Sequence, residues 1–304
     1  MSELSGTGAG AGNGKDGGAG AGGGARDRTF LVTGGNTGIG RATATALAAG
    51  GGRVYITSRS AEAGAAAVDA IKSAAGSQAV WLLPLDLASL ASVRDCAAAF
   101  LGRDEPLHVL VNNAGVGGQR GKTADGFELH FGVNHLGHFA LTMLLLDRLK
   151  ASGTGAGAQG TRVVTVSSDA HYGAPGIDFD AVRRSTPSFT GQREYAVSKL
   201  CNVLFTQELA RRVSDVSSYA LHPGVVASDI WRRVPRPARA IIKRRMLTVE
   251  QGAVTSVYCA TSPAVAAESG LFYDKCAVRA PSRVATPELA ELLWKHSTEW
   301  TGLG

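Results

Sequence analysis

The sequence has little cysteine and lacks the segments that would export it or anchor it in a membrane. Its four cysteines are far apart and form no C-x-x-C pair, which argues against a disulfide framework and against a cysteine-based zinc site. No apolar run approaches the roughly 20 residues of a membrane-spanning helix. The N-terminus lacks the basic and then apolar pattern of a secretory signal. We therefore expect a soluble, cytoplasmic protein.

Two further features are scarce, metal-binding clusters and evenly spread positive charge. His135 and His138 lie three residues apart, but no carboxylate or cysteine cluster accompanies them, so we predict packing or hydrogen bonding and no metal site. The net charge is +6, yet the segment 231–246 alone carries seven Lys or Arg residues and no acidic residue. Because the basic character is local, we expect no nucleic-acid partner.

The N-terminal segment is made almost entirely of small residues. Its first 24 positions contain eleven glycines and almost nothing to bury, so ordering entropy would not be offset. These glycines follow no strand and precede no helix, which argues against a phosphate-binding loop. We predict a disordered tail over 1–28 and a single domain over 29–304.

The rest of the chain alternates short apolar runs with helical patterns. This alternation predicts an α/β fold of the Rossmann type, a doubly wound parallel sheet with helices on both faces. Ligands of such sheets bind beyond the carboxyl ends of the strands, where the suggestive motifs of this chain fall. The strand-like runs are 28–35, 53–59, 79–87, 107–115, 161–168, 216–224 and 269–274; the helical stretches are 37–51, 60–76, 89–102, 131–150, 192–213, 250–262 and 286–300.

A glycine-rich turn, "TGGNTGIG", joins the first strand to the first helix. Glycines there let the backbone turn tightly and approach a phosphate, and a helix N-terminus supplies amide donors and a favourable dipole. In this strand–turn–helix context the motif favours dinucleotide binding. The predicted cofactor contacts in it are Gly34, Asn36, Thr37, Gly38, Ile39 and Gly40.

The end of the second strand distinguishes the two nicotinamide cofactors. A fold that selects NAD usually offers a carboxylate there for the ribose 2′-hydroxyl. This chain has Ser58 and Arg59 and no acidic residue. Arg59 would bind a 2′-phosphate through charge-assisted hydrogen bonds, unless it is merely a solvated surface residue. We therefore predict NADP(H).

The heptapeptide "EYAVSKL" places Tyr195 and Lys199 four residues apart on a predicted helix. Side chains at this spacing lie on the same helical face. A nearby cation favours a phenolate and lowers the pKa of a tyrosine. The alternative is a tyrosine in the core and a lysine whose ammonium extends to water.

Seven motifs follow one another in order: "TGGNTGIG", "DLAS", "NNAG", "VNHLGHF", "VSS", "YAVSK" and "HPGVVAS". In these motifs the chain resembles the short-chain dehydrogenases/reductases over residues 29 to about 300. The finer resemblance, in "VNHLGHFALT" and "SKLCNVLFTQELARR", is to the retinol-dehydrogenase-like branch. Many vertebrate members carry an N-terminal membrane anchor where this chain has its glycine-rich segment, so we expect neither membrane localisation nor retinoid specificity to carry over.

The resemblance implies roles for four residues. Tyr195 would be the general acid/base that exchanges a proton with the substrate oxygen, and Lys199 would lower its pKa and bind the nicotinamide ribose. Ser168 would hydrogen-bond the substrate oxygen, and Asn134 would hold a water that relays protons to Lys199. Hydride transfer to a carbonyl develops negative charge on oxygen, which donors at Ser168 and Tyr195 would stabilise.

The resemblance also implies further cofactor contacts. Asp86 would meet the adenine ring, and the "NNAG" motif would shape the strand end beside the adenosine and ribose. Asn112 of that motif could instead only stabilise the sheet. The implied contacts are Asp86, Leu87, Asn112, Ala114, Gly115, Tyr195, Lys199, Pro223, Gly224, Val226 and Ser228, which stands where Thr is more usual.

Residues 229–248 fall where the family has its substrate-binding lid. Ile241, Ile242 and Met246 could face a lipophilic substrate, or 231–246 could rest on an anionic membrane surface, or the lid could simply be solvated. Family members often form homodimers through the helices that hold Asn134 and Tyr195, and nothing in the sequence requires this.

The sequence therefore predicts an oxidoreductase that uses NADP(H) to reduce an apolar aldehyde or ketone, or to catalyse the reverse reaction. Its partner would be a small lipophilic carbonyl compound or alcohol. The alternative is a catalytically silent NADP(H)-binding sensor, which would normally have lost Ser168, Tyr195 or Lys199. All three residues are present.

Overall fold

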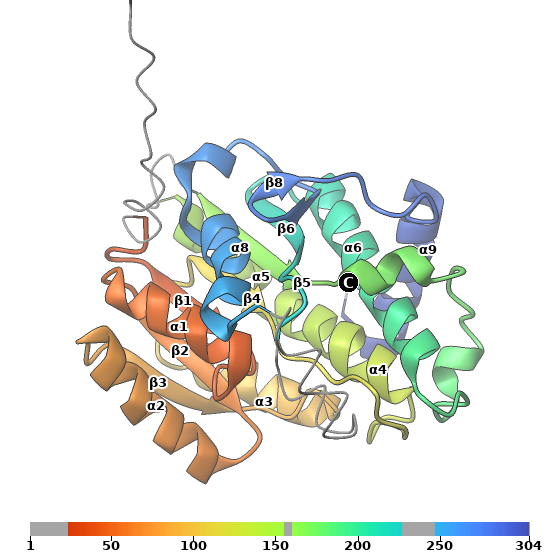
Figure 1. Ribbon diagram of the computed structural model, residues 1–304, viewed down its shortest axis with the longest axis horizontal. Coiled ribbons are helices and arrows are strands. Elements are labelled where there is room, and N and C mark those ends of the chain that lie inside the picture. The colour runs from red at the N-terminus through yellow and green to blue at the C-terminus, as the bar shows by residue number, and fades with distance from the viewer. Residues whose placement is uncertain (1–23, 155–159, 227–246, 304) are drawn as a thin grey trace, which may run out of the picture.

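The computed structural model describes residues 24–154, 160–226 and 247–303. In this part of the chain eight strands form one sheet in the order β3-β2-β1-β4-β5-β6-β7-β8 (Figure 1). All neighbouring strands pair in parallel except β7 and β8, which form an antiparallel hairpin that was not predicted. The strands are β1 Thr29–Val32, β2 Arg53–Ser58, β3 Val80–Pro84, β4 Val109–Asn112, β5 Thr161–Val166, β6 Val216–His222, β7 Leu271–Asp274 and β8 Ala277–Val278.

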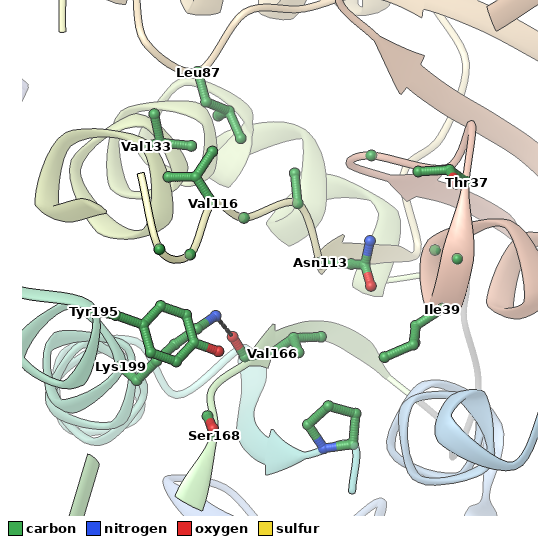
Figure 2. Close-up of a pocket in the computed structure, with 18 of the residues that line it drawn as sticks. Thr37, Ile39, Leu87, Asn113, Val116, Val133, Val166, Ser168, Tyr195 and Lys199 are labelled. Carbon is green, nitrogen blue, oxygen red and sulfur yellow. Dashed lines mark hydrogen bonds between the residues drawn. The ribbon is translucent and has the colours of Figure 1, made fainter. Parts of the chain in front are cut away.

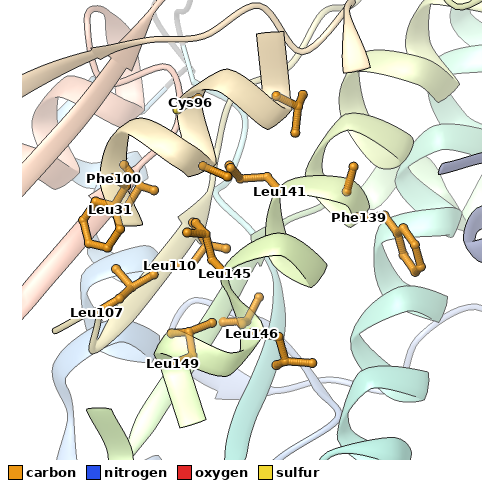
Figure 3. Close-up of a cluster of buried hydrophobic side chains, with 14 of the residues drawn as sticks. Leu31, Cys96, Phe100, Leu107, Leu110, Phe139, Leu141, Leu145, Leu146 and Leu149 are labelled. Atoms are coloured by element: carbon orange, nitrogen blue, oxygen red, sulfur yellow. The ribbon is translucent and has the colours of Figure 1, made fainter. Parts of the chain in front are cut away.

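Helices cover both faces of the sheet, as the apolar strands predicted. The small side chains of α1, α2 and α8 pack on one face, and larger leucine and aromatic side chains of α3, α5, α6 and α9 pack on the other. Figure 3 shows part of this second layer, with Leu141, Leu145 and Leu149 of α5 in the same buried cluster as Phe100 of α3. The helices are α1 Gly38–Ala49, α2 Ala61–Ala75, α3 Leu90–Leu101, α4 Leu129–Phe131, α5 Gly137–Gly153, α6 Gln192–Arg212, α8 Val249–Thr261 and α9 Pro287–Thr301.

The order of the strands reverses between β1 and β4, since β2 and β3 lie on one side of β1 and β4 to β7 on the other. A doubly wound sheet binds its ligand outside the carboxyl ends of the strands at this switch point. The turns after β1 and β4 are therefore adjacent, although 80 residues separate Thr33 from Asn113.

The domain begins before residue 29, so the predicted boundary of the glycine-rich tail was wrong. Ala25 is fully buried and Arg28 is 6% exposed. The Arg28 side chain donates to the carbonyl of Gly160 at 2.5 Å. The apolar and hydrogen-bonding partners of these two residues come from the folded domain, which a composition argument does not detect. Residues 1–23 lie outside the described part of the chain.

The helical stretch Leu129–Gly153 includes a π-helical turn, Gly132–Leu136, between α4 and α5. Within the described residues this stretch is the one helix that is long and apolar enough to cross a membrane, whereas the sequence predicted none. Of its apolar window, 83% is buried inside the fold. Such burial is typical of a core helix.

Candidate active site

A cavity of about 1420 Å³ opens at the carboxyl ends of the strands. Its walls come from the segments that follow β1 to β6, so it lies at the switch point of the sheet. Figure 2 shows Tyr195 and Lys199 entering from α6 and Ser168 from the end of β5, across the cavity from Thr37 and Ile39. Residues distant in the sequence thus line one cavity.

Most of the predicted site residues line this cavity. Ser228 and the predicted lid, apart from Leu247 and Thr248, lie outside the described residues. Asn112 and Asn134 are buried beside the cavity and do not line it. The predicted residues that line it are Gly34, Asn36, Thr37, Gly38, Ile39, Gly40, Ser58, Arg59, Asp86, Leu87, Ala114, Gly115, Ser168, Tyr195, Lys199, Pro223, Gly224 and Val226.

The turn after β1 can admit a ligand close to the backbone. Gly34 and Gly38 have φ values of +65° and +53°, which favour glycine. A Cβ at Gly40 would lie 2.4 Å from the carbonyl oxygen of Gly34, so only glycine fits there. The side chain of Thr37 does not cap α1, and the first turn holds no acidic residue. The N-terminal amides of α1 therefore suit an anionic group in the cavity.

Thr33 joins the ends of β1 and β4 beneath this turn. Its Oγ1 accepts hydrogen bonds from the backbone amides of Asn113 and Ala114, each at 2.9 Å, and contacts His138 Nε2 at 2.9 Å. The Asn112 side chain points elsewhere and donates to Thr142 on α5 at 3.0 Å. The Asn112 side chain thus joins β4 to α5, whereas Asn113 lines the cavity.

Tyr195 and Lys199 both extend from α6 toward the cavity. Lys199 Nζ donates to the carbonyl of Val166 at 2.9 Å and lies 5.6 Å from the centroid of the Tyr195 ring. Ser168 lies on the side of the cavity that the phenol of Tyr195 faces. The alternative in which the lysine reaches bulk water is wrong, because the Lys199 residue is only 4% exposed.

Burial controls the protonation of both groups. It raises the pKa of Tyr195, and the Ser168 hydroxyl lowers that pKa only in part. Burial lowers the pKa of Lys199 to about 8. The Lys199 ammonium donates to the carbonyl of Val166, and its lowering of the tyrosine pKa stays a prediction.

Asn134 stands in the π-helical turn and ties it to the cavity wall. Its Oδ1 accepts from the amide of Val116 at 2.8 Å, and its Nδ2 donates to the Val116 carbonyl at 3.0 Å and to Ser198 Oγ at 2.9 Å. A Cβ at Gly115 would lie 3.1 Å from Asn134 Oδ1 and 3.7 Å from Lys199 Nζ. Asn134 and Lys199 therefore flank the same glycine, and a side chain there would crowd Asn134.

The two neighbouring histidines make hydrogen bonds, as predicted. His135 Nε2 contacts Ser297 of α9 at 2.9 Å, and His138 lies between Thr33 and the carbonyl of Asn134. Burial lowers the pKa of His135 to about 3 and that of His138 to about 4, so both are neutral at physiological pH. Among the described residues, no group of three or more His, Cys, Asp or Glu residues is arranged to hold a metal ion.

Motif reasoning missed part of the cavity wall. Asn113 could have been found, because it belongs to "NNAG". Val133, His222 and Val225 also belong to quoted motifs, "VNHLGHF" and "HPGVVAS". The missed residues that carry no motif include Thr57, Val116, Gly117, Gly118, Arg120, Asp169, Phe189, Thr190 and Gln192.

Comparison with known proteins identifies the class to which this fold and site belong. A family model described as short chain dehydrogenase matches residues 28–179. Human retinol dehydrogenase 11 is 42% identical over 282 residues, which cover 91% of this chain and 86% of the human protein. Human retinol dehydrogenase 12 is 41% identical, and the match covers 91% of this chain and 87% of the human protein. The chain is a member of the short-chain dehydrogenase family of oxidoreductases.

Solved structures agree with this assignment. A protein from Mycobacterium paratuberculosis shares the fold with a TM-score of 0.72 at 31% identity, covering 91% of this chain and 94% of that one. The complex of RhlG with NADP from Pseudomonas aeruginosa has a TM-score of 0.65 at 26% identity, covering 81% and 94%. The predicted fold class and the family resemblance are confirmed.

Proposed function

We propose that this protein uses NADP(H) to reduce an apolar aldehyde or ketone to the alcohol, or catalyses the reverse reaction. The observation that supports this most strongly is the convergence of Ser168, Tyr195 and Lys199 on one cavity at the switch point of the sheet. The similarity to retinol dehydrogenases 11 and 12 favours a lipophilic substrate.

The described residues fit a dinucleotide. The cavity of about 1420 Å³ exceeds the roughly 300–1,000 Å³ of an ordinary small-ligand site, so a cofactor and a substrate can share it. Its wall runs from the turn after β1 past Arg59 and Asp86 to Tyr195. Arg59 is exposed at the end of β2 and belongs to a segment without a carboxylate, which supports a cofactor with a 2′-phosphate.

The bound cofactor would supply the hydride. The residues of the chain would orient the carbonyl and manage its proton. The hydroxyls of Ser168 and Tyr195 would both donate to the substrate oxygen, where negative charge develops, and Tyr195 would give up its proton to form the alcohol. Lys199, when charged, would favour the resulting phenolate, and Asn134 would take part in proton return through water.

The test is NADPH oxidation followed at 340 nm with a panel of apolar aldehydes and ketones, retinal included. Turnover that disappears in Tyr195→Phe, with NADPH binding retained, is the expected result. If NADPH binds tightly and no compound in a broad panel turns over, the catalytically silent sensor becomes the better account. If NADPH does not bind, the proposal is wrong.

We also propose a cytoplasmic location. In the described part of the chain, three of the four cysteines are buried free thiols and the longest apolar helix is a core helix. Contact of 231–246 with a membrane, and formation of a homodimer, stay predictions. The first concerns residues outside the described part of the chain.

A further inference from the structure

Phe189 is the most exposed of the large apolar side chains that the structure describes. It is 88% exposed, whereas the next two, Val225 and Val278, are 53% exposed. Phe189 and Val225 come from different segments of the chain, and both line the cavity that holds Tyr195. A single exposed apolar residue is common on any protein. Here two of them stand at one functional cavity, which calls for a more specific explanation.

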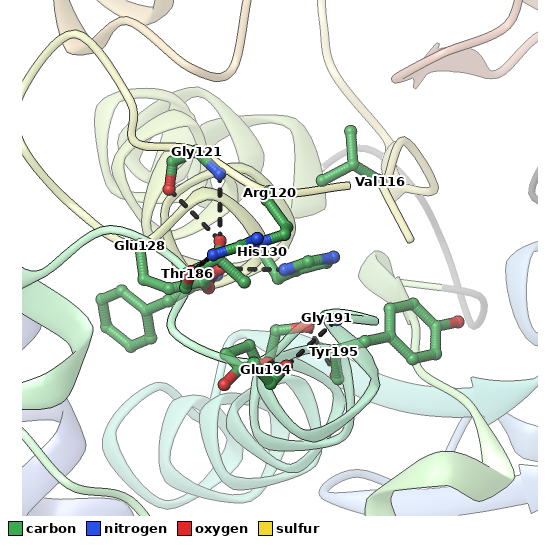
Figure 4. A network of polar contacts seen from close by, with 12 residues as sticks. Val116, Arg120, Gly121, Glu128, His130, Thr186, Gly191, Glu194 and Tyr195 are labelled. Atoms are coloured by element: carbon green, nitrogen blue, oxygen red, sulfur yellow. Dashed lines mark hydrogen bonds and ion pairs between the residues drawn. The ribbon is translucent and has the colours of Figure 1, made fainter. Parts of the chain in front are cut away.

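The segment that carries Phe189 is fixed on its N-terminal side by Thr186. The amide of Thr186 donates to the Gly121 carbonyl at 3.1 Å, and its Oγ1 accepts from the Gly121 amide at 3.1 Å. The same hydroxyl bonds the carboxylate of Glu128, which is 2% exposed and also holds His130 (Figure 4). The buried carboxylate thus fastens the segment to the body of the domain.

Hydrogen bonds between Ser188 and the residues that follow Phe189 fix the segment a second time. Ser188 Oγ donates to the carboxylate of Glu194 and accepts from the Gly191 amide at 3.0 Å. Gly191 has a φ of +67°, and a Cβ there would lie 2.8 Å from His130 Cε1. The amide of Tyr195 in turn donates to the Gly191 carbonyl at 2.9 Å. Phe189 is therefore held at a set place relative to Tyr195.

We propose that Phe189 is a specificity-determining residue that packs against the part of the substrate remote from the carbonyl. The substrate class that fits is an aldehyde or ketone with an extended hydrocarbon or aryl tail, because burying an exposed phenyl ring against such a tail is favourable. Ser188 and Glu194 act as positioning residues for this ring. This inference rests on the proposed function, since it assumes that the carbonyl is placed at Tyr195.

The kinetic test compares a long and a short substrate in matched variants. In Phe189→Ala the ratio of kcat/KM for decanal to that for propanal falls about tenfold, because the tail loses its apolar contact. Phe189→Leu restores most of the ratio, and Ser188→Ala lowers it about threefold. Val278→Ala, which shortens an exposed apolar side chain on β8 outside the cavity wall, leaves the ratio unchanged. An unchanged ratio in Phe189→Ala overturns the inference.

A second measurement does not depend on turnover. Phe189→Trp is placed in a Tyr195→Phe background, loaded with NADP⁺ and titrated with decan-1-ol or with ethanol. The added tryptophan fluorescence, taken as the difference from the same protein with Phe189 intact, shifts to shorter wavelength with decan-1-ol and not with ethanol. No shift contradicts the inference. If the fluorescence shifts but the protein with Tyr195 intact reduces no aldehyde, the apolar binding site is supported and the proposed reaction is wrong.

Discussion

The two ends of the cavity are built in different ways. At the end formed by the turns after β1 and β2, the wall is backbone and small residues, with Gly34, Gly38 and Gly40 followed by Arg59. At the other end the chemistry depends on side chains that are buried and held from several elements. The first end therefore depends on the conformation of the backbone, and the second depends on the placement of particular side chains.

Because the two ends are built differently, substitutions at each end should affect different steps. A change at the glycine and arginine end should alter which cofactor binds and how tightly, with the reacting groups left in place. A change at the tyrosine and lysine end should alter the chemical step, with cofactor binding retained.

The largest effect is expected for Tyr195→Phe. Loss of the phenolic proton removes the general acid, which typically contributes about 10²–10⁴-fold to the rate. We expect kcat to fall by about 10³-fold while the NADPH dissociation constant, measured by fluorescence titration, changes less than about threefold. A comparable weakening of NADPH binding would show that the two ends are not separate.

Arg59→Asp should produce the opposite pattern. Removing a guanidinium and adding a carboxylate beside a 2′-phosphate should raise the KM for NADPH roughly 30-fold, since hydrogen bonds between charged groups are strong. The KM for NADH should change little. Lys295→Asp makes the same charge change at an exposed position of α9 and serves as the control. Equal effects on NADPH and NADH would refute the assignment of NADP(H).

The reduction reaction should lose activity as the pH rises through about 8. The lowered pKa of Lys199 means that its ammonium is charged below that pH and neutral above it. The raised pKa of Tyr195 keeps the phenol protonated over the same range. We expect kcat/KM for an aldehyde to fall about tenfold per pH unit above 8. The control variant Cys276→Ala should show the same fall in kcat/KM above pH 8. If kcat/KM of the wild type stays constant up to pH 9.5, the role of Lys199 is contradicted.

The smallest effect concerns the junction between the two ends. Thr33→Val would leave the amide of Ala114 without its acceptor, and that of Asn113 with only the carbonyl of Val111, in a mostly buried site. We expect a loss of about 2 kcal/mol in the free energy of unfolding, measured in urea. Thr45→Val removes an exposed hydroxyl on α1 and should change that free energy by less than about 0.5 kcal/mol. If Thr33→Val lowers the free energy of unfolding no more than Thr45→Val does, the hydrogen bonds of Thr33 add no measurable stability.

The same contrast explains what the sequence could and could not predict. Strand and helix alternation and the glycine turn are local patterns, so the fold and the turn after β1 were predicted closely. Other features depend on contacts that no local pattern shows. They are the hydrogen bond from Lys199 to Val166, the hydrogen bond from Asn112 to α5, and the hairpin of β7 and β8. The loop around Phe189 carries no motif, because its position is set by Thr186 and Glu194 and not by a repeated pattern.

The most direct test of the central claim is transfer of a label. Wild-type protein and Tyr195→Phe are incubated with decanal and NADPH that carries deuterium at C4 of the nicotinamide on the face from which hydride leaves, each face being tested in turn. The account predicts decan-1-ol one mass unit heavier from wild type with one of the two labelled cofactors, and no alcohol from the variant. NADPH bound in the cavity with no label in the product, for either face and across a series of apolar aldehydes, would contradict the account.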